Sequence, residues 1–189
     1  MKKQKPMIKK KRRKYSIFYL LKGNAKNYRN KLVKEVGPTF GERYVFDSKL
    51  PAHITLKVPF ETNDIKNIEE NLKEFVKNHK ESKIKIIEFG HFRRFVAFLK
   101  FEFSKNALSI QKDLINSLNK IKDISISKTD KQWHPHATIS YGNTKKSFNG
   151  IWEHLKKLKR PYFEIMFDNI TIMKKSGKYW KIHKKFKLK

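Results

Sequence analysis

The sequence contains no cysteine among its 189 residues. This absence excludes disulfide bonds, zinc sites built on thiolates and cysteine nucleophiles. It fits a reducing compartment, and we expect the protein to be cytoplasmic. Any catalytic group must therefore come from other side chains.

Long apolar runs are also missing. The longest clean run covers residues 15–21, whereas a membrane-spanning helix needs about 20 apolar residues. Lysines and arginines precede this run, as in a signal peptide, but no small-residue cleavage site follows it. We interpret the run as a β-strand and expect no membrane partner.

The sequence has no glycine-rich phosphate-binding loop. Neither G-x-G-x-x-G nor G-x-x-x-x-G-K-[ST] occurs, which argues against an ATP-driven ligase or kinase. The segment K-T-D-K at 128–131 lacks the glycine of the lysyl-adenylate motif K-x-D-G. We therefore expect chemistry that needs no cofactor.

Acidic residues are scarce, with 17 Asp and Glu against 46 Lys and Arg and a formal charge of +29. Such a charge favours a polyanionic partner, and RNA, DNA or an anionic membrane surface are the candidates. The alternative is an AT-rich genome that supplies many merely solvated lysines. Residues 1–14 hold nine Lys and Arg and no acid. They predict a flexible basic arm, which either adds phosphate contacts or only solubilises the chain.

One short phrase occurs twice. It reads P-A-H-I-T-L-K-V at residues 51–58 and H-P-H-A-T-I-S-Y at 134–141. Residues i and i+2 of a strand share a face. We therefore expect the polar face of the first strand to carry His53, Thr55 and Lys57. The polar face of the second strand should carry His136, Thr138 and Ser140. The intervening apolar residues would anchor each strand in a core.

The pattern around the first phrase predicts an alternation of strands and helices. Strands are expected at residues 15–22, 44–46, 52–60 and 83–89, and helices at 25–36 and 65–78. Gly37 and Pro38 should stop the first helix. One of the three residues Thr62, Asn63 and Asp64 should cap the second.

The order then recurs. Residues 94–103 predict a strand, and Ser104 caps a helix that runs to about residue 121. A short strand at 124–127, the second motif strand and a helix at 147–158 follow. Strands at 162–174 and 178–188 are expected to form a final hairpin. Phe18 precedes His53 by 35 residues (53 − 18) and Phe98 precedes His136 by 38 (136 − 98), which is typical of a duplicated unit.

Paired H-x-T motifs, H53-I-T-L and H136-A-T-I, on strands of a duplicated unit resemble the 2H phosphoesterase superfamily. The best-known branch of this superfamily is the 2′-5′ RNA ligase / RNA 2′,3′-cyclic phosphodiesterase family, and the resemblance covers residues 15–188. It implies an α+β fold of two pseudo-symmetric lobes, each a β-α-β-α-β unit, with antiparallel-rich sheets facing a central cleft and helices outside. The folded domain would then be residues 15–189, as a single bilobal unit.

The resemblance also implies the roles of four residues. His53 and His136 carry over as the catalytic pair, and Thr55 and Thr138 as phosphate-binding hydroxyls. The implied activity is a metal-independent hydrolysis of 2′,3′-cyclic phosphates, or the joining of 2′-5′ linkages, on RNA or nucleotides. Histidine suits both proton transfers because its unperturbed pKa is near ~6.5. Which histidine is the acid and which the base stays open.

Further residues are candidates for substrate contact. Lys57, Ser140 and Tyr141 follow from strand geometry. Phe92 and Trp133 could stack on bases, and Arg93 and Arg94 could contact phosphates, although aromatic residues with strand periodicity are more often core.

His134 and His136 form H-x-H, but no Asp, Glu or His cluster accompanies them, so we expect no metal site. The remaining histidines, His79, His91, His154 and His183, predict surface or structural roles. We expect a monomer.

Two other functions stay open at this point. The chain could be a noncatalytic RNA-binding protein on the same fold, which the basic charge alone supports. It could also be a phosphodiesterase for a small cyclic nucleotide or an ADP-ribose derivative.

Overall fold

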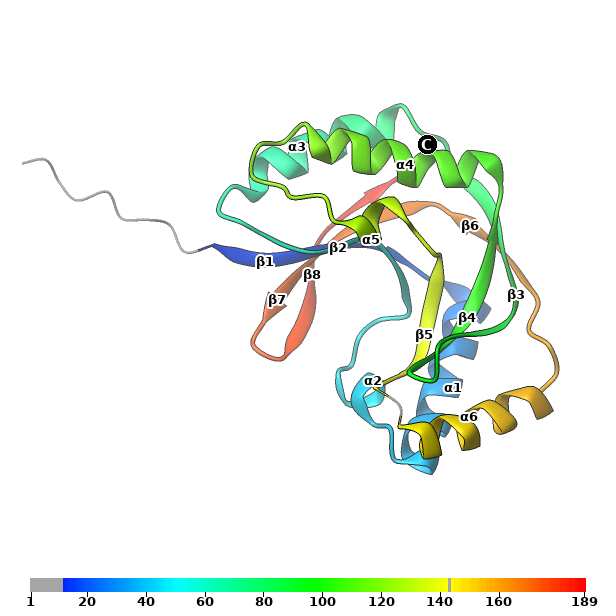
Figure 1. Ribbon diagram of the computed structural model, residues 1–189. Coiled ribbons are helices and arrows are strands. Elements are labelled where there is room, and N and C mark those ends of the chain that lie inside the picture. The colour runs from blue at the N-terminus through cyan, green and yellow to red at the C-terminus, as the bar shows by residue number, and fades with distance from the viewer. Residues whose placement is uncertain (1–11, 143) are drawn as a thin grey trace, which may run out of the picture.

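The computed structural model describes residues 12–142 and 144–189. The strands it describes form two antiparallel sheets of four strands each (Figure 1). The first sheet has the order β2 (His53–Thr62), β1 (Arg13–Leu20), β7 (Asn169–Ser176) and β8 (Tyr179–Lys187). The second has the order β5 (His136–Tyr141), β4 (Val96–Phe103), β3 (Ser82–Phe92) and β6 (Phe163–Phe167).

The longer helices lie at the two ends of the molecule, whereas the short helix α5 (Lys128–Lys131) lies beside β2 (Figure 1). The other helices are α1 (Gly23–Phe40), α2 (Tyr44–Asp47), α3 (Ile65–Lys77), α4 (Lys105–Asn119) and α6 (Lys145–Lys157). α3 and α4 pack together at one end, where Ser117 Oγ donates to Asn71 Oδ1 over 2.9 Å. α1 and α6 pack together at the other end. The expected α+β fold of two antiparallel lobes is confirmed.

The two sheets share one plan. Each has its motif strand at one edge, followed inward by the strand that starts its unit: β2 beside β1, and β5 beside β4. The connection between these two strands contains a helix in both units, α1 in one and α4 in the other. The third strand of each sheet does not come from the same unit as its first two. β3 follows the first motif strand in the chain but joins the second sheet, and β7 takes the third place in the first sheet.

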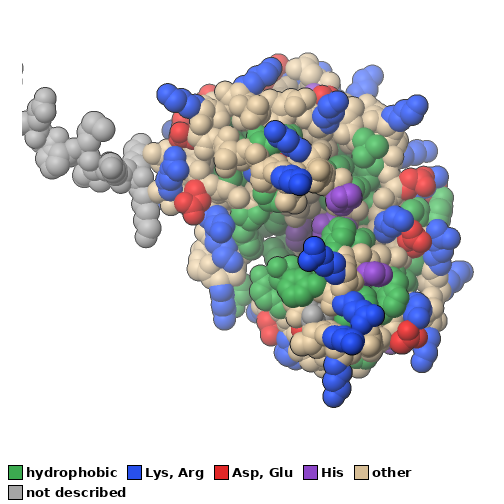
Figure 2. Space-filling view, in the orientation of Figure 1, with side chains coloured by type: hydrophobic (Ala, Val, Ile, Leu, Met, Phe, Trp, Pro, Cys, Tyr) green, Lys and Arg blue, Asp and Glu red, His purple; other side chains and the backbone are tan. Residues whose placement is uncertain are grey.

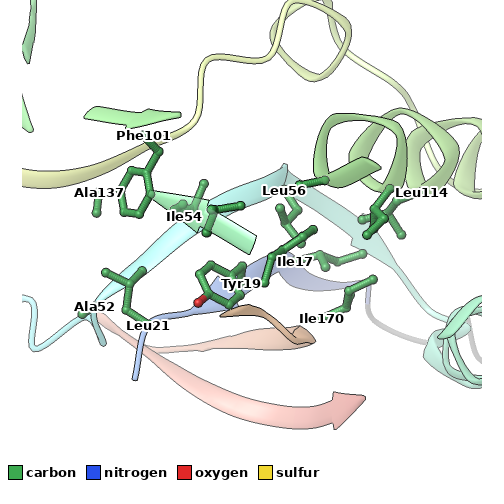
Figure 3. Packing of buried hydrophobic residues seen from close by; sticks show 14 of the residues in the cluster. Ile17, Tyr19, Leu21, Ala52, Ile54, Leu56, Phe101, Leu114, Ala137 and Ile170 are labelled. Atoms are coloured by element: carbon green, nitrogen blue, oxygen red, sulfur yellow. The ribbon is translucent and has the colours of Figure 1, made fainter. Parts of the chain in front are cut away.

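A single cluster of buried apolar side chains joins both sheets (Figure 3). Ile54 and Leu56 of β2 and Ala137 of β5 are all at most 1 % exposed. They belong to the same cluster as Phe101 of β4 and Leu114 of α4. The apolar sides of both motif strands are thus anchored in common packing, as their alternation predicts.

Two predicted features of the first unit are wrong. The first helix does not stop at Gly37 and Pro38 but continues to Phe40, and Gly41 ends it in the left-handed conformation, with φ 77°. Gly37 is buried against the chain that follows, where a Cβ would lie 3.1 Å from the Glu42 carbonyl oxygen. Pro38, near the helix end, removes only one backbone hydrogen bond. Residues 44–47 form the short helix α2 rather than a strand.

Two features of the second unit also differ from the prediction. Residues 124–127 form no strand. Instead Ser127 and Asp130 make a capping box that starts the short helix α5, in the way that such reciprocal caps do. The expected strand at 162–174 is divided at Asp168, so that β6 and β7 lie in different sheets. The hairpin prediction holds only for β7 and β8.

The predicted basic arm lies mostly outside the described residues, which begin at Arg12. Its last two residues, Arg13 and Lys14, open β1 and pair with Thr62 and Glu61 of β2. The first strand therefore begins two residues before the predicted boundary.

Candidate active site

Each motif strand carries a β-bulge at the same place. In β2 the pairing with β1 shifts between Phe18, opposite Thr55, and Ile17, opposite Lys57. In β5 the pairing with β4 shifts between Phe98, opposite Thr138, and Ala97, opposite Ser140. The extra residue follows the motif threonine in both strands. A bulge of this kind interrupts the alternation of side chains between the two faces of a sheet.

The bulges correct two predicted substrate contacts. Lys57 and Ser140, expected beside the motif histidines, are turned inward and are fully buried. Lys57 Nζ lies 2.9 Å from Asp130 Oδ2, and the two side chains are 1 % and 0 % exposed. Neither Lys57 nor Ser140 is therefore placed to contact a substrate.

The two motif histidines have the same hydrogen bond. His53 Nδ1 donates to the carbonyl oxygen of Pro51 over 2.7 Å, and His136 Nδ1 donates to that of His134 over 2.7 Å. A carbonyl oxygen only accepts, so Nδ1 carries the proton in both rings. In the neutral ring Nε2 is then the free acceptor. Both histidines present the same nitrogen for proton transfer.

Phenylalanines from equivalent positions hold the two rings. Phe18 of β1 stacks on His53 with centroids 3.9 Å apart and planes at 18°. Phe98 of β4 lies 5.1 Å from His136, and Phe92 of β3 meets His136 edge-on at 4.9 Å. Gly90, opposite Phe98 across the pair β3 and β4, makes room for this ring, because a Cβ there would lie 2.4 Å from Phe98 Cε2.

The two motif histidines lie near each other, since the charge of His136 acts on His53. Figure 2 shows histidine side chains in the hollow between the two halves of the molecule, beside hydrophobic side chains and with Lys and Arg around it. The pKa of His53 is lowered to about 3, mainly by burial and to a smaller extent by the positive charges of Arg29 and His136, against a hydrogen bond to Pro51 that raises it. Burial is also the main cause that lowers the pKa of His136, followed by the charge of His134. Both rings are thus neutral near pH 7 in the free protein.

The motif threonines share the half-buried face of the histidines. Their carbonyl groups tie the two lobes together. Trp133 Nε1, just before β5, donates to Thr55 O of β2 over 2.7 Å. Arg29 Nε of α1 donates to Thr138 O of β5 over 2.9 Å. Each motif strand is therefore fixed by a side chain from the other unit.

Arg29 is a site residue that sequence reasoning missed. It is 2 % exposed, and burial lowers the pKa of its guanidinium to about 10. Its Nη1 also donates to Leu50 O over 3.4 Å, so that it bridges the segment before β2 to β5. The available signal was its spacing: it stands on the apolar stripe of α1, four residues after Ala25 and three before Leu32.

The predicted aromatic and basic contacts divide into two groups. Trp133 is half-buried, packs edge-on against Phe103 at 5.0 Å and donates its N–H to Thr55 O, so its ring is held in place by β4 and β2. Phe92 and Tyr141, which are 36 % and 44 % exposed, remain available.

Arg93 and Arg94 are exposed in the turn between β3 and β4, close to Phe92 in the chain. Two further exposed rings adjoin Tyr141: Phe95 at 5.0 Å and Tyr44 of α2 at 5.4 Å.

Most of the other histidines have partners of their own. His79 Nε2 lies 3.5 Å from Asp113, His154 Nε2 lies 3.0 Å from Glu35, and His183 Nε2 lies 2.8 Å from Glu69. His91 Nδ1 donates to the Arg93 carbonyl over 2.6 Å. Within residues 12–142 and 144–189, no three His, Asp or Glu side chains gather in a group that could hold a metal ion. No helix in the same ranges is long and apolar enough to cross a membrane.

Comparisons with known proteins agree with this geometry. A model of the 2′-5′ RNA ligase superfamily matches residues 39–178, a range that contains both H-x-T motifs. No curated protein matches the sequence significantly.

Solved structures with the same fold cover nearly the whole chain. A phosphoesterase has a TM-score of 0.63 at 12 % identity, covering 93 % of this chain and 98 % of its own. LigT of E. coli, solved with 3′-AMP, has a TM-score of 0.61 at 9 % identity, covering 94 % and 99 %. Usb1 of Kluyveromyces marxianus has a TM-score of 0.52 at 14 % identity, covering 93 % and 97 %. At these identities the similarity concerns the fold.

Proposed function

Because the chain belongs to the 2′-5′ RNA ligase superfamily, we propose that it is a metal-independent phosphoesterase acting on RNA or nucleotide 2′,3′-cyclic phosphates. The observation that carries this proposal is the matched pair of histidines. His53 and His136 have the same tautomer, fixed by the same hydrogen bond to residue i−2. Binding a phosphate needs no such pair of proton-transfer groups, whereas cleaving a phosphodiester needs a base and an acid.

The proposed reaction is hydrolysis of the cyclic ester. Nε2 of one neutral histidine takes a proton from water while the water oxygen attacks phosphorus. The bond between phosphorus and one ribose oxygen breaks, and Nε2–H of the other histidine, protonated beforehand, gives its proton to that oxygen. The hydroxyls of Thr55 and Thr138 donate to the nonbridging oxygens, where negative charge grows. With a 5′-hydroxyl in place of water as the attacking group, the same steps join a 2′-5′ linkage when the bond from phosphorus to the 3′-oxygen breaks and that oxygen takes the proton.

The surroundings of the two histidines suggest which is the base. The charge of Arg29 acts on His53 and disfavours its protonated form. In this proposal His53 is the base and His136 the acid. The anionic cyclic phosphate, once bound, favours protonation in the cleft, since an opposite charge nearby stabilises the imidazolium.

Phe92, whose ring lies 4.9 Å from that of His136, would stack on the terminal base. Arg93 and Arg94, next to Phe92 in the chain, would contact phosphate or the base plane, and Tyr141 at the end of β5 is a further exposed ring for stacking. Stacking on an aromatic side chain contributes about 1–3 kcal/mol per base and tolerates every base. Such a stacking surface binds the terminal nucleoside without distinguishing its base.

The experiment is product analysis on three substrates: RNA with a 2′,3′-cyclic phosphate, a 2′-5′ oligonucleotide, and ADP-ribose 1″,2″-cyclic phosphate. We expect the first to be hydrolysed, with EDTA causing no loss. His53→Ala and His136→Ala should each reduce kcat/KM by roughly 10²–10⁴-fold while circular dichroism shows an intact fold. Full activity of either variant would overturn the paired-histidine mechanism. Turnover of only the ADP-ribose compound would reassign the enzyme to small substrates. Binding of RNA without turnover of any of the three would identify a noncatalytic RNA-binding protein.

A further inference from the structure

A cavity lies beside the segment that leads into the first motif strand. It has a volume of about 680 Å³ and is enclosed by α1, by the segment from α2 to Pro51, and by Lys178 and Tyr179 at the tip of the β7–β8 hairpin. Two of its wall residues belong to the site as well. The carbonyl of Pro51 holds the His53 ring, and Arg29 bridges to Thr138. The cavity and the motif strands thus share two structural residues, Pro51 and Arg29.

The cavity wall is strongly cationic. Arg29, Lys34, Lys49 and Lys178 all line it. Among the described residues of the wall, Asp47 is the only acidic one, and Asp47 Oδ1 already lies 3.2 Å from Arg43 Nη2. Lys34 and Lys49 are exposed, with no ion pair among the contacts described for them. The wall thus offers several positive charges to a ligand with more than one phosphate.

Aromatic rings run from His53 toward the same hairpin. Phe18 stacks on His53 at 3.9 Å, and Trp180 of β8 lies 6.2 Å from Phe18. Tyr179, the preceding residue, lines the cavity beside Lys178, whose Nζ is 5.2 Å from the centre of its ring. Rings alternating with lysines are the composition that single-stranded nucleic acids bind, through base stacking and phosphate contacts.

One residue of the wall has a strained backbone. Lys49 has φ 51°, a left-handed conformation that residues other than glycine, asparagine and aspartate seldom adopt. Such strain is often retained where a side chain must point at a ligand. At Lys49 it sets the direction of the chain into Leu50 and Pro51, which lie between the cavity and His53.

We propose that this cavity, together with the β7–β8 tip, binds the single-stranded RNA that precedes the cyclic phosphate. The inference rests on the proposed function, since it identifies the substrate as an RNA strand rather than a mononucleotide. A mononucleoside cyclic phosphate fills the cleft between the histidines and does not reach the cavity. An oligonucleotide places its upstream phosphates on Lys34, Lys49 and Lys178 and a base on Tyr179.

The test compares uridine 2′,3′-cyclic phosphate with a five-nucleotide RNA that ends in the same group. We expect wild-type kcat/KM to be at least about tenfold higher for the longer substrate. Lys34→Ala/Lys178→Ala should remove this advantage and leave kcat/KM for uridine 2′,3′-cyclic phosphate unchanged. Because each phosphate contact on a single strand contributes a salt slope of about 0.7, the double variant should also lower the slope of log kcat/KM against log salt by about 1.4. Tyr179→Ala should reduce kcat/KM for the longer substrate about tenfold.

The matched control is Lys73→Ala/Lys120→Ala, which removes two exposed lysines on α3 and after α4, at the opposite end of the molecule from α1 (Figure 1). It should keep the preference for the longer substrate. Equal kcat/KM for both substrates in the wild type, or an undiminished preference in the cavity variants, would overturn the inference and leave the proposed function standing. If neither substrate is hydrolysed, fluorescence anisotropy with a labelled five-nucleotide RNA decides. Loss of RNA binding in the cavity variants, with binding retained in the control variant, supports the proposed RNA site in the cavity. Equal binding by the wild type and the cavity variants overturns the proposal.

Discussion

Arg29 gives His53 an electrostatic environment that His136 does not share. Its buried guanidinium lowers the pKa of His53, after the larger effect of burial itself. A nearby positive charge disfavours the imidazolium, whereas the neutral ring is little affected. At the residue scale this difference separates two otherwise equivalent histidines and motivates the assignment of His53 as the base.

The first prediction concerns this charge. Arg29→Gln should raise the pKa of His53, which should nevertheless stay below 6.5 because burial, the largest cause, remains. Glutamine can still donate one hydrogen bond toward Thr138 O or Leu50 O, which protects the fold. The measurement is an NMR titration of the histidine side chains. Lys31→Gln, which removes an exposed charge from the same helix, is the control and should leave the titration of His53 unchanged. An unaltered pKa in Arg29→Gln would show that the guanidinium does not act on His53.

The second prediction concerns Gly90. In Gly90→Ala the new Cβ would lie 2.4 Å from the Phe98 ring, which must move and so displace the His136 ring beside it. We expect a destabilisation of about 1–3 kcal/mol from overpacking and a kcat reduced about tenfold at a temperature where the protein is folded. Gly90 would thus act as a positioning residue.

Gly150→Ala provides a matched control for Gly90→Ala. Its Cβ would meet another phenylalanine ring, that of Phe40, at 2.8 Å, in α6 and outside the motif strands. It should lower the melting temperature without lowering kcat. Equal kcat in the two variants would indicate that Gly90 serves packing alone.

At the scale of the elements, α5 and its neighbours hold the first motif strand from outside its sheet. Asp130 accepts from Val58 N over 2.9 Å and pairs with Lys57. Gln111 Nε2 donates to Leu56 O over 3.3 Å. Together with the bond from Trp133 to Thr55, these contacts cover the open edge of β2 directly after the motif. An edge strand that would otherwise be free to move is thereby fixed.

The third prediction tests this support. Although burial alone raises it, the pKa of Asp130 is lowered overall by hydrogen bonds from Lys57, Val58 and Ser127, so Asp130 is charged at neutral pH. Asp130→Ala leaves Lys57 buried without a counter-charge, which costs about 3–5 kcal/mol. Urea denaturation should show this loss.

A double variant without either charge distinguishes the cost of an unpaired buried charge from the loss of the carboxylate's hydrogen bonds. Lys57→Met/Asp130→Asn leaves no unpaired charge, and the introduced amide oxygen can still accept from Val58 N. The free energy of unfolding of this double variant should lie within about 1–2 kcal/mol of the wild type. A double variant as unstable as Asp130→Ala would show that the hydrogen bonds of the carboxylate, rather than the charge balance, hold β2.

Local signals predicted most elements because local interactions form them. Ser104 caps α4 and Asp64 caps α3, as their positions before apolar stripes indicate. The alternation in each motif strand correctly predicted which face the side chains share from the histidine to the threonine. It failed at Lys57 and Ser140, because the bulges depend on how β1 and β4 pair with these strands, and pairing is not encoded in two-residue periodicity.

At the scale of the whole molecule, the sequence did not predict that β3 would join the second sheet and β7 the first. A duplicated sequence predicts two similar units, and each motif strand does lie beside the first strand of its own unit. Which strand fills the third place depends on long-range packing. Asn169, at the start of β7, decides it in part: its side chain exchanges two hydrogen bonds with the backbone of Leu20 in β1. Arg29 and Trp133 were missed as ties between the lobes for the same reason, since their partners are 109 and 78 residues away in the chain.

The last prediction follows from the cleft shared by both lobes, which holds two uncharged imidazoles in a strongly basic molecule. In the unfolded chain His53 titrates near 6.5, and in the folded protein its pKa is lowered to about 3. Between these values the unfolded state binds the proton and the folded state does not. The free energy of unfolding therefore falls as the pH is lowered below 6.5. The lowered pKa of His136 acts in the same direction.

The pH range from 6.5 to 4.5 separates this effect from that of the carboxylates, whose ordinary values are 4.5 for glutamate and 3.8 for aspartate. Across this range we expect His53 alone to cost about 2 kcal/mol of stability, and His136 to add to this cost. In His53→Asn/His136→Asn that part of the acid lability should disappear, so that the variant becomes relatively more stable than the wild type as the pH falls. Urea denaturation at half-unit pH steps measures both curves. Parallel curves would mean that the histidines gain their protons in the folded state as readily as in the unfolded chain.

The pH dependence of kcat/KM gives a second measurement, because a base and an acid acting together produce a bell-shaped profile. If the stability curves are parallel, this profile should be centred near pH 6.5. If the curves diverge as expected, the free-enzyme profile of kcat/KM should have both limbs below 6.5, because it needs one neutral and one protonated ring and both have lowered pKa values.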